Sequence, residues 1–124
     1  MWLGIVDVRD VASAHVAAAT LQKAHGRYLA VSESMRLLEV AQALRPSLQG
    51  LADKLPTREL PKMMMWALAP WIGMTREYVK LNVGYELQFD SRRSQKELGV
   101  SYRAPGFTFS DHIAQLAADG LLAG

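Results

Sequence analysis

The sequence predicts a helix-rich α/β fold with two or three short strands and about five helices in one domain. Three observations support this. A short apolar run at residues 3–8 is followed by an alanine-rich segment whose apolar residues recur at helical spacing. The same strand-then-helix order returns at residues 27–45, and the patterns beyond residue 60 are mostly helical. A chain of 124 residues is long enough for one domain with a core of its own.

The first strand and helix are predicted at residues 3–8 and 10–24. Leu3–Val8 is apolar and rich in β-branched residues, which is typical of a strand. Asp10 can cap the following helix by accepting hydrogen bonds from its first free amides. Gly26 ends this helix, because glycine tolerates the left-handed geometry found after a helix.

A second strand is predicted at Arg27–Val31, with a turn at residues 32–34. Ser34 can then cap a helix from Met35 to about Arg45, which Pro46 follows. In a complete sheet the strand at Arg27–Val31 would form an edge beside a parallel neighbour. Left unpaired, its backbone would favour association with another chain.

The middle of the chain is less regular. Residues 49–60 read as a connection, and Lys62–Trp71 as an apolar helix that Pro70 ends or kinks. Thr75 can open a further helix toward Tyr85, and Leu87–Phe89 can form a short strand.

The C-terminal part has clearer boundaries. Asp90 can cap a helix at Ser91–Leu98 that Gly99 ends, and residues 100–107 form a loop. Thr108 and Asp111 have the spacing of a capping box for a last helix, which runs to Asp119.

Composition excludes several classes of protein. Half of the residues are hydrophobic and 21% are charged, which is typical of a folded chain. No cysteine is present, which excludes disulfides and cysteine-bound metals and is compatible with a reducing compartment. The apolar stretch Met63–Met74 is too short to span a bilayer, and no targeting segment is evident. The net charge of +2 is spread along the chain and does not favour a nucleic-acid partner. We expect a cytoplasmic protein without a nucleic-acid or membrane partner.

Several short motifs resemble the C-terminal third of the extended short-chain dehydrogenases/reductases, within the NAD-dependent epimerase/dehydratase superfamily. The branch that they resemble contains dihydroflavonol reductases, cinnamoyl-CoA reductases and aldehyde reductases. The N-terminal motifs are Val6–Ala12, Ala14-His15 and Gly26–Leu29. The C-terminal motifs are Phe89–Ser91, Glu97–Gly99, Tyr102-Arg103, Pro105 and Asp119–Leu121. They occur in the family's order and spacing over nearly the whole chain, and thin out between residues 46 and 86.

The resemblance implies an incomplete piece of a doubly wound NAD(P)-binding fold, with residues 1–124 as the substrate-side portion of a carbonyl or alcohol oxidoreductase. Family members bind the cofactor on a glycine-rich turn and use a Tyr-x-x-x-Lys pair for the chemistry. This sequence contains neither. We therefore expect no cofactor on this chain alone, NADP or NAD in any full-length parent, no dinucleotide-binding domain, and no activity of the isolated chain.

Other candidate residues have simpler structural interpretations. His15 could act as a general base, but no nucleophile is placed beside it, and His25 and His112 are too scattered to suggest a metal site. Asp7 and Asp10 could form a carboxylate pair, although a helix cap explains Asp10 more simply. Ser32 and Ser34 lack a neighbouring base, so neither is a convincing nucleophile.

The methionine- and tryptophan-rich segment is the strongest candidate for a binding surface. Met63, Met64, Trp66 and Trp71 are the residues that we predict for a pocket that takes a small apolar or aromatic carbonyl substrate. The alternative interpretation is ordinary packing between helices. Three consecutive methionines point in different directions on a helix, so at least one is expected to face solvent or a partner.

Two hypotheses for function follow. The chain is either the substrate-binding part of a dihydroflavonol reductase-like enzyme, or a non-catalytic module derived from that fold that binds small molecules or proteins. In both cases we expect self-association or a separate N-terminal domain as a partner.

Overall fold

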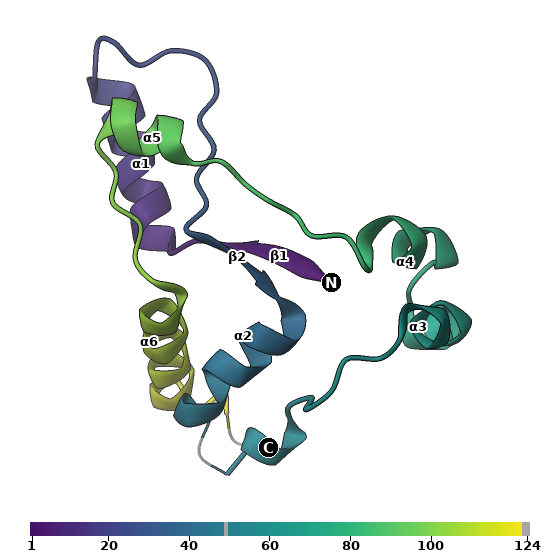
Figure 1. The fold of residues 1–124 in the computed structure, drawn as a ribbon. Coiled ribbons are helices and arrows are strands. Elements are labelled where there is room, and N and C mark those ends of the chain that lie inside the picture. Colours follow the sequence, from purple (N-terminus) through teal and green to yellow (C-terminus); the bar gives the residue numbers. More distant parts are fainter. Residues whose placement is uncertain (49, 123–124) are drawn as a thin grey trace.

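The computed structural model describes residues 1–48 and 50–122 (Figure 1). This part of the chain contains strands β1 (Trp2–Ile5) and β2 (Glu33–Arg36). Its α-helices are α1 (Val8–Thr20), α2 (Leu37–Leu44), α3 (Lys62–Leu68), α4 (Arg76–Asn82), α5 (Arg92–Leu98) and α6 (Pro105–Ala118). Three short 3₁₀ turns, at Arg45–Ser47, Ala52–Lys54 and Ala69–Ile72, complete the described elements. The predicted helix-rich α/β class is confirmed.

The two strands form an antiparallel pair at the centre of the molecule. Trp2 lies opposite Arg36, and Ile5 lies opposite Glu33. Hydrogen bonds from Ser32 N to Ile5 O (2.8 Å) and from Leu37 N to Met1 O (2.9 Å) extend the pairing beyond both ends of the ladder. The second strand therefore lies where a turn and the start of a helix were predicted, and the predicted start of that helix at Met35 is wrong.

The predicted strand at Arg27–Val31 is also wrong, because no neighbouring strand pairs with this segment. Its carbonyl groups are bound instead by side chains of α5. Ser94 Oγ donates to Leu29 O at 2.8 Å, and Arg93 Nη1 donates to Arg27 O at 3.2 Å. Because these residues form no strand, the expectation of an exposed parallel edge strand here is wrong as well.

Helix α1 begins earlier than predicted. Asp7, not Asp10, occupies the capping position, and its carboxylate accepts from Arg9 N at 2.8 Å. The helix ends at Thr20, four residues before the predicted end. His25 consequently lies in the connection after α1 rather than at the helix terminus.

Helices α5 and α6 frame the C-terminal part. Helix α5 ends at Gly99, as predicted, with the glycine in the left-handed region at φ +69°. Asp90 accepts from Arg92 N at 3.0 Å, although Ser91 occupies the capping position. Helix α6 starts at Pro105, because proline has a backbone angle suited to the first helical position. The predicted capping box at Thr108 is therefore wrong.

The middle of the chain forms a small lobe of its own, which we call the α3–α4 lobe (residues 62–83). Thr75 caps α4 by accepting from Tyr78 N at 3.0 Å, as predicted. Figure 1 shows this lobe set apart from the other helices and joined to them by two long connections. The second connection contains residues 87–89, where the predicted strand is absent; Leu87 O accepts from Ser34 Oγ at 2.5 Å.

The buried core is divided into two clusters, one between α1 and α5 and one in the α3–α4 lobe. Ala14, Leu98 and Val100 pack together where α1 meets α5. In the α3–α4 lobe, Ala69 and Val79 are completely buried with Val83 beside them.

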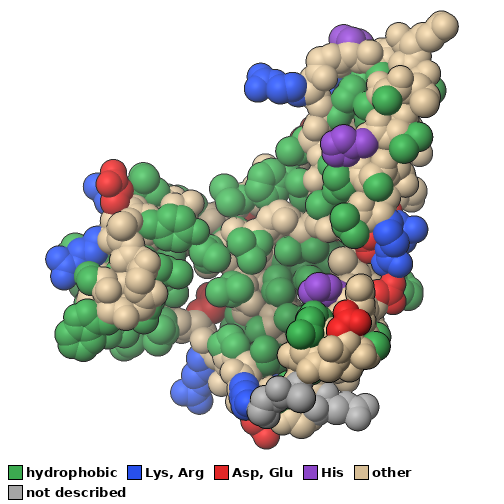
Figure 2. Space-filling model, turned by 180° about the vertical axis from the view of Figure 1, so that it is seen from behind, with side chains coloured by type: hydrophobic (Ala, Val, Ile, Leu, Met, Phe, Trp, Pro, Cys, Tyr) green, Lys and Arg blue, Asp and Glu red, His purple; other side chains and the backbone are tan. Residues whose placement is uncertain are grey.

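The remaining surface is large for a chain of this mass. The accessible area is 8978 Å², whereas a compact monomer of 13.7 kDa exposes about 6,600 Å². Seen from behind, hydrophobic side chains spread over the centre of the molecule and over the α3–α4 lobe at the left (Figure 2). Among the described helices, none has the length and apolar character needed to cross a membrane.

Candidate functional site

The two N-terminal aspartates are both buried, and each has its own arginine. The Arg9 guanidinium donates two hydrogen bonds to the Asp7 carboxylate, from Nε to Oδ1 at 2.9 Å and from Nη2 to Oδ2 at 2.7 Å. Thr108 Oγ1 adds a third side-chain bond to Asp7 at 2.9 Å. These donors hold the pKa of Asp7 well below its ordinary value, and the carboxylate raises the pKa of Arg9. A carboxylate held this firmly in its charged form is a structural anchor and is poorly suited to proton transfer.

Asp10 ties the start of α1 to the segment before α6. Its Oδ2 accepts from Arg103 N at 2.7 Å, and its Oδ1 pairs with the Arg103 guanidinium. The two residues lie 93 positions apart in the sequence. Asp7 and Asp10 thus do not share one site as a catalytic pair.

A third set of motif residues joins α5 to the connection between α1 and β2. Tyr28 Oη donates to Glu97 Oε2 at 2.8 Å, and Arg93 Nε donates to Glu97 Oε1 at 3.1 Å. The Arg93 hydrogen bond is the main reason that the pKa of Glu97 is lowered. Arg93 also lies over the Tyr28 ring at 4.7 Å, which stabilises the guanidinium further.

Ser94 is a buried hub of hydrogen bonds, and none of the sequence motifs includes it. Its Oγ lies 2.8 Å from Leu29 O, 2.7 Å from Ser91 O and 2.7 Å from Tyr102 Oη. One sequence signal could have revealed it: Ser94 precedes the buried Leu98 by four residues, and so lies on the apolar face of α5.

The histidines and the candidate serines show no catalytic arrangement. His15 Nδ1 lies 2.8 Å from Val11 O in its own helix, and His25 Nδ1 lies 2.9 Å from Lys23 O. Ser32 and Ser34 donate to the backbone carbonyls of Arg103 and Leu87. Across residues 1–48 and 50–122, no three carboxylate or histidine side chains gather as a metal-binding group.

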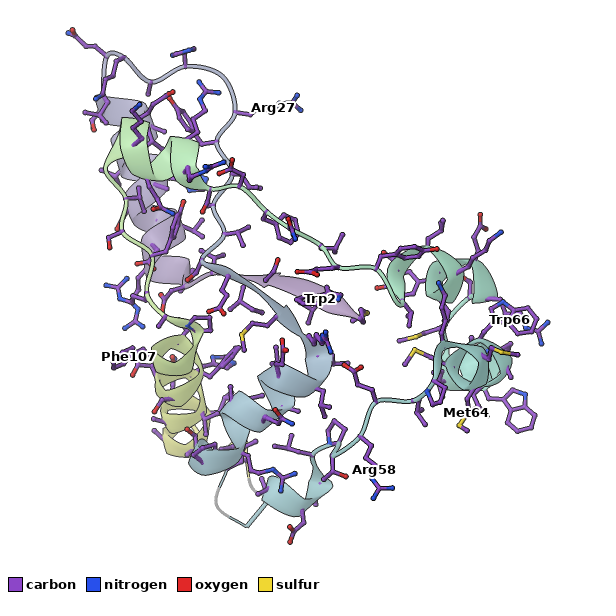
Figure 3. All side chains as sticks on the ribbon, viewed as in Figure 1. Trp2, Arg27, Arg58, Met64, Trp66 and Phe107 are labelled. Carbon is purple, nitrogen blue, oxygen red and sulfur yellow. The ribbon has the colours of Figure 1, made fainter. Side chains whose placement is uncertain are left out.

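A groove of about 620 Å³ lies between the end of the sheet and the α3–α4 lobe. It is lined by Met1 and Trp2, by residues 36–38, and by residues 56, 58–62, 65 and 83–84. Figure 3 shows Arg58 on the connection that leads to α3, with Trp2 on β1 across the opening. This volume falls in the range of pockets that take small organic ligands.

The four predicted pocket residues do not line this groove. Met63 and Trp71 have 85% and 88% of their surface exposed, and Met64 and Trp66 are about half exposed. Figure 3 shows Met64 and Trp66 pointing away from the sheet. Their neighbours Lys62 and Met65 face the groove instead, because positions three apart lie on one side of a helix.

Neither junction from strand to helix in the described residues fits the phosphates of a dinucleotide. Such phosphates bind to the free amides at a helix N-terminus. At the β1–α1 junction the Asp7 carboxylate already accepts from Arg9 N. At the β2–α2 junction Glu39 Oε2 accepts from Arg36 N at 2.7 Å. Both junctions therefore place a negative charge where a phosphate would have to lie.

Comparison with solved structures gives a likeness that covers nearly the whole chain. The fold is similar to part of the protein in the crystal structure of gox2253, with a TM-score of 0.74, 26% sequence identity and 97% of this chain covered. The chain spans 38% of the length of gox2253. No protein-family model matches the chain, and no curated protein matches it.

Proposed function

We propose that this chain is the substrate-binding C-terminal part of an NAD(P)-dependent carbonyl or alcohol oxidoreductase. The parent enzyme resembles the dihydroflavonol reductases, and the cofactor and the reacting groups come from a part of the enzyme that this chain does not contain. The isolated chain is inactive. The complete enzyme works in the reducing environment of the cytoplasm, with which the lack of cysteine in this chain is compatible.

The observation that carries this proposal is how the resembling motifs meet in space. Asp10 from the first motif binds Arg103 from one of the last, and Tyr28 binds Glu97. Both pairs join segments more than 60 residues apart, so the motifs work as one set of contacts that holds the fold together. The meeting of these motif residues in the fold supports the resemblance to the reductases.

The large accessible surface supports the proposal that this chain packs against a cofactor-binding part of the enzyme. The excess over a compact monomer of this mass is about 2,400 Å². Obligate interfaces commonly bury 2,000–5,000 Å² in total, counting both sides. Burying this excess against a cofactor-binding part would produce an interface in the same range. The likeness to 38% of a longer chain agrees with such a division.

The sequence also supports a separate source for the chemistry. It lacks both the glycine-rich turn and the Tyr-x-x-x-Lys pair, and both strand-to-helix junctions among residues 1–48 and 50–122 are acidic. This chain would contribute the substrate side of the active site. The nicotinamide cofactor, bound elsewhere, would supply the hydride that reduces the carbonyl carbon.

The test begins with the DNA upstream of the coding sequence. We expect it to encode a glycine-rich turn and a Tyr-x-x-x-Lys pair, in frame or in a neighbouring frame. The two polypeptides, produced together, should form a stable complex that binds NADPH, whereas this chain alone should show no saturable heat of NADPH binding in calorimetry. An unrelated upstream region, or micromolar NADPH binding by this chain alone, would overturn the proposal.

The outer face of the α3–α4 lobe favours a second candidate function, a non-catalytic interaction module. Met63 and Trp71 are almost fully exposed, and adaptable sulfur and aromatic side chains suit a partner surface. The same upstream sequence separates the two candidates, since an independent module requires no reductase segment beside it.

A further inference from the structure

We propose that the groove between β1 and the α3–α4 lobe binds a small amphipathic anion, an apolar ring or chain that carries one carboxylate. The inference rests on the proposed function for the ligand's role as a substrate. The lining residues of the groove, without that function, support the chemistry of binding.

Three cationic side chains surround the groove, and they outnumber its acidic lining. Arg36, Arg58 and Lys62 line it together with the single carboxylate of Glu59. The groove therefore carries a net positive charge, whereas the whole chain is only weakly basic. Such an imbalance at one concave site favours an anionic ligand.

The cationic groups remain available to a ligand. Neither Arg58 nor Lys62 takes part in the ion pairs found among residues 1–48 and 50–122. Arg36 Nε lies 4.0 Å from Glu39 Oε1, which is a loose pair between two exposed side chains. A bound carboxylate would give the guanidinium groups better hydrogen-bonding geometry than they have now.

Lys62 is held in place without being neutralised. Its Nζ donates to Lys80 O at 3.0 Å and lies 4.3 Å from the centre of the Tyr85 ring. Both contacts orient the ammonium group and leave its charge uncompensated by a carboxylate. The side chain thus presents a fixed positive charge on the α3 side of the groove.

The rest of the lining is apolar and includes one aromatic ring. Trp2 lies below the Arg36 guanidinium, 5.1 Å from guanidinium carbon to ring centre. Leu37, Leu60, Met65 and Val83 add aliphatic and thioether surface. A ligand with an apolar body can pack on these side chains while its carboxylate meets Arg36 or Arg58. A fully polar anion such as phosphate would leave this apolar lining uncovered.

The probe for this proposal is 3-phenylpropanoate, compared with its neutral isostere 3-phenylpropanamide and with inorganic phosphate. Binding is followed by two-dimensional NMR of the nitrogen-15-labelled full chain, with the Trp2 indole N–H as the reporter. We expect saturable binding of the carboxylate, with binding of the amide and of phosphate weaker by about tenfold or more. The Trp2 signal should shift while the signals of Trp66 and Trp71 remain in place.

The double variant R36Q/R58Q should weaken binding of the carboxylate about tenfold and leave binding of the amide unchanged. R27Q is the control for loss of positive charge outside the groove, because Arg27 does not line it; R27Q removes one positive charge, whereas the double variant removes two. Equal affinity for carboxylate and amide, equal loss in R27Q, or no saturation by 3-phenylpropanoate would each overturn the proposal. An upstream region unrelated to a reductase would overturn the proposed function and leave the anion-binding groove standing.

Discussion

Ser94 offers the sharpest test of how the motif segments are held together. Its side chain is fully buried, and its Oγ lies within 2.8 Å of Leu29 O, Ser91 O and Tyr102 Oη. A hydroxyl group donates one hydrogen bond, so Ser94 donates to one of the carbonyls while it accepts from Tyr102. Replacing Ser94 with alanine removes both bonds without creating a large cavity.

The expected cost follows from these contacts. Each buried neutral hydrogen bond contributes about 1 kcal/mol, which gives about 2 kcal/mol for the pair. Alanine is the better helix former by about 0.5 kcal/mol, so Ser94→Ala should lower the free energy of unfolding by about 1.5 kcal/mol. Tyr102→Phe should lower it by about 1 kcal/mol, since it mainly removes the bond shared with Ser94.

The double variant tests the shared bond directly. Because both substitutions remove the same Ser94–Tyr102 bond, the double variant should lose about 1.5 kcal/mol, well below the sum of the two single effects. Urea unfolding followed by far-ultraviolet circular dichroism measures all three. Ser110→Ala is the matched control, an exposed serine in α6 whose loss should leave stability unchanged or slightly raised. Strictly additive losses, or a Ser94→Ala effect no larger than the control, would refute this account of the hub.

Three further predictions concern the cap, the helix end and the exposed face. The pKa of Asp7 is lower in the folded protein than its ordinary value of 3.8. The negative charge of Asp7 therefore stabilises the fold at pH values above 3.8, and this contribution to the free energy of unfolding is lost as the pH falls below 3.8. Asp7→Asn, which keeps a capping oxygen, should therefore flatten the loss of stability between about pH 5 and pH 2 in acid titrations; an unchanged slope would contradict the ion pair. Gly99→Ala should cost about 1 kcal/mol of unfolding free energy because the backbone is left-handed there, whereas Gly106→Ala should stabilise α6 by up to about 0.5 kcal/mol. An added Cβ would meet no atom within 4 Å at either glycine, so equal effects in thermal melts would rule out backbone strain as the cause. In sedimentation velocity the chain should self-associate as its concentration rises, and the double variant M63S/W71S should reduce the association; a monomer at every concentration would count against this surface.

The parts of the fold that were predictable have strong local causes. Helix α5 ends at Gly99, and α4 starts after Thr75, because a left-handed glycine and a capping hydroxyl act within a few residues. The strand at Arg27–Val31 was predicted from composition alone. Strand formation needs a partner, and the side chains of α5 reach the carbonyls of this segment instead.

In the candidate site too, local sequence patterns predict some features and leave the packing direction open. For the methionine- and tryptophan-rich segment one expectation is confirmed: at least one of three adjacent methionines was expected to face solvent or a partner, and Met63 is exposed. Which face of α3 meets the groove depends on the packing of the α3–α4 lobe. That packing turns Lys62 and Met65 inward, and no local pattern specifies the direction.

The sequence by itself determined the class of fold, the end of α5 at Gly99, the start of α4 after Thr75, and the lack of the motifs that bind a dinucleotide. Composition, caps and spacing act over a few residues, so they can be read without coordinates. Only the tertiary structure decided that Asp7 reaches Thr108, that Asp10 reaches Arg103 and that β2 pairs with β1. These contacts join residues between about 30 and 100 positions apart, and they form because burial brings distant polar groups together and requires each of them to find a partner.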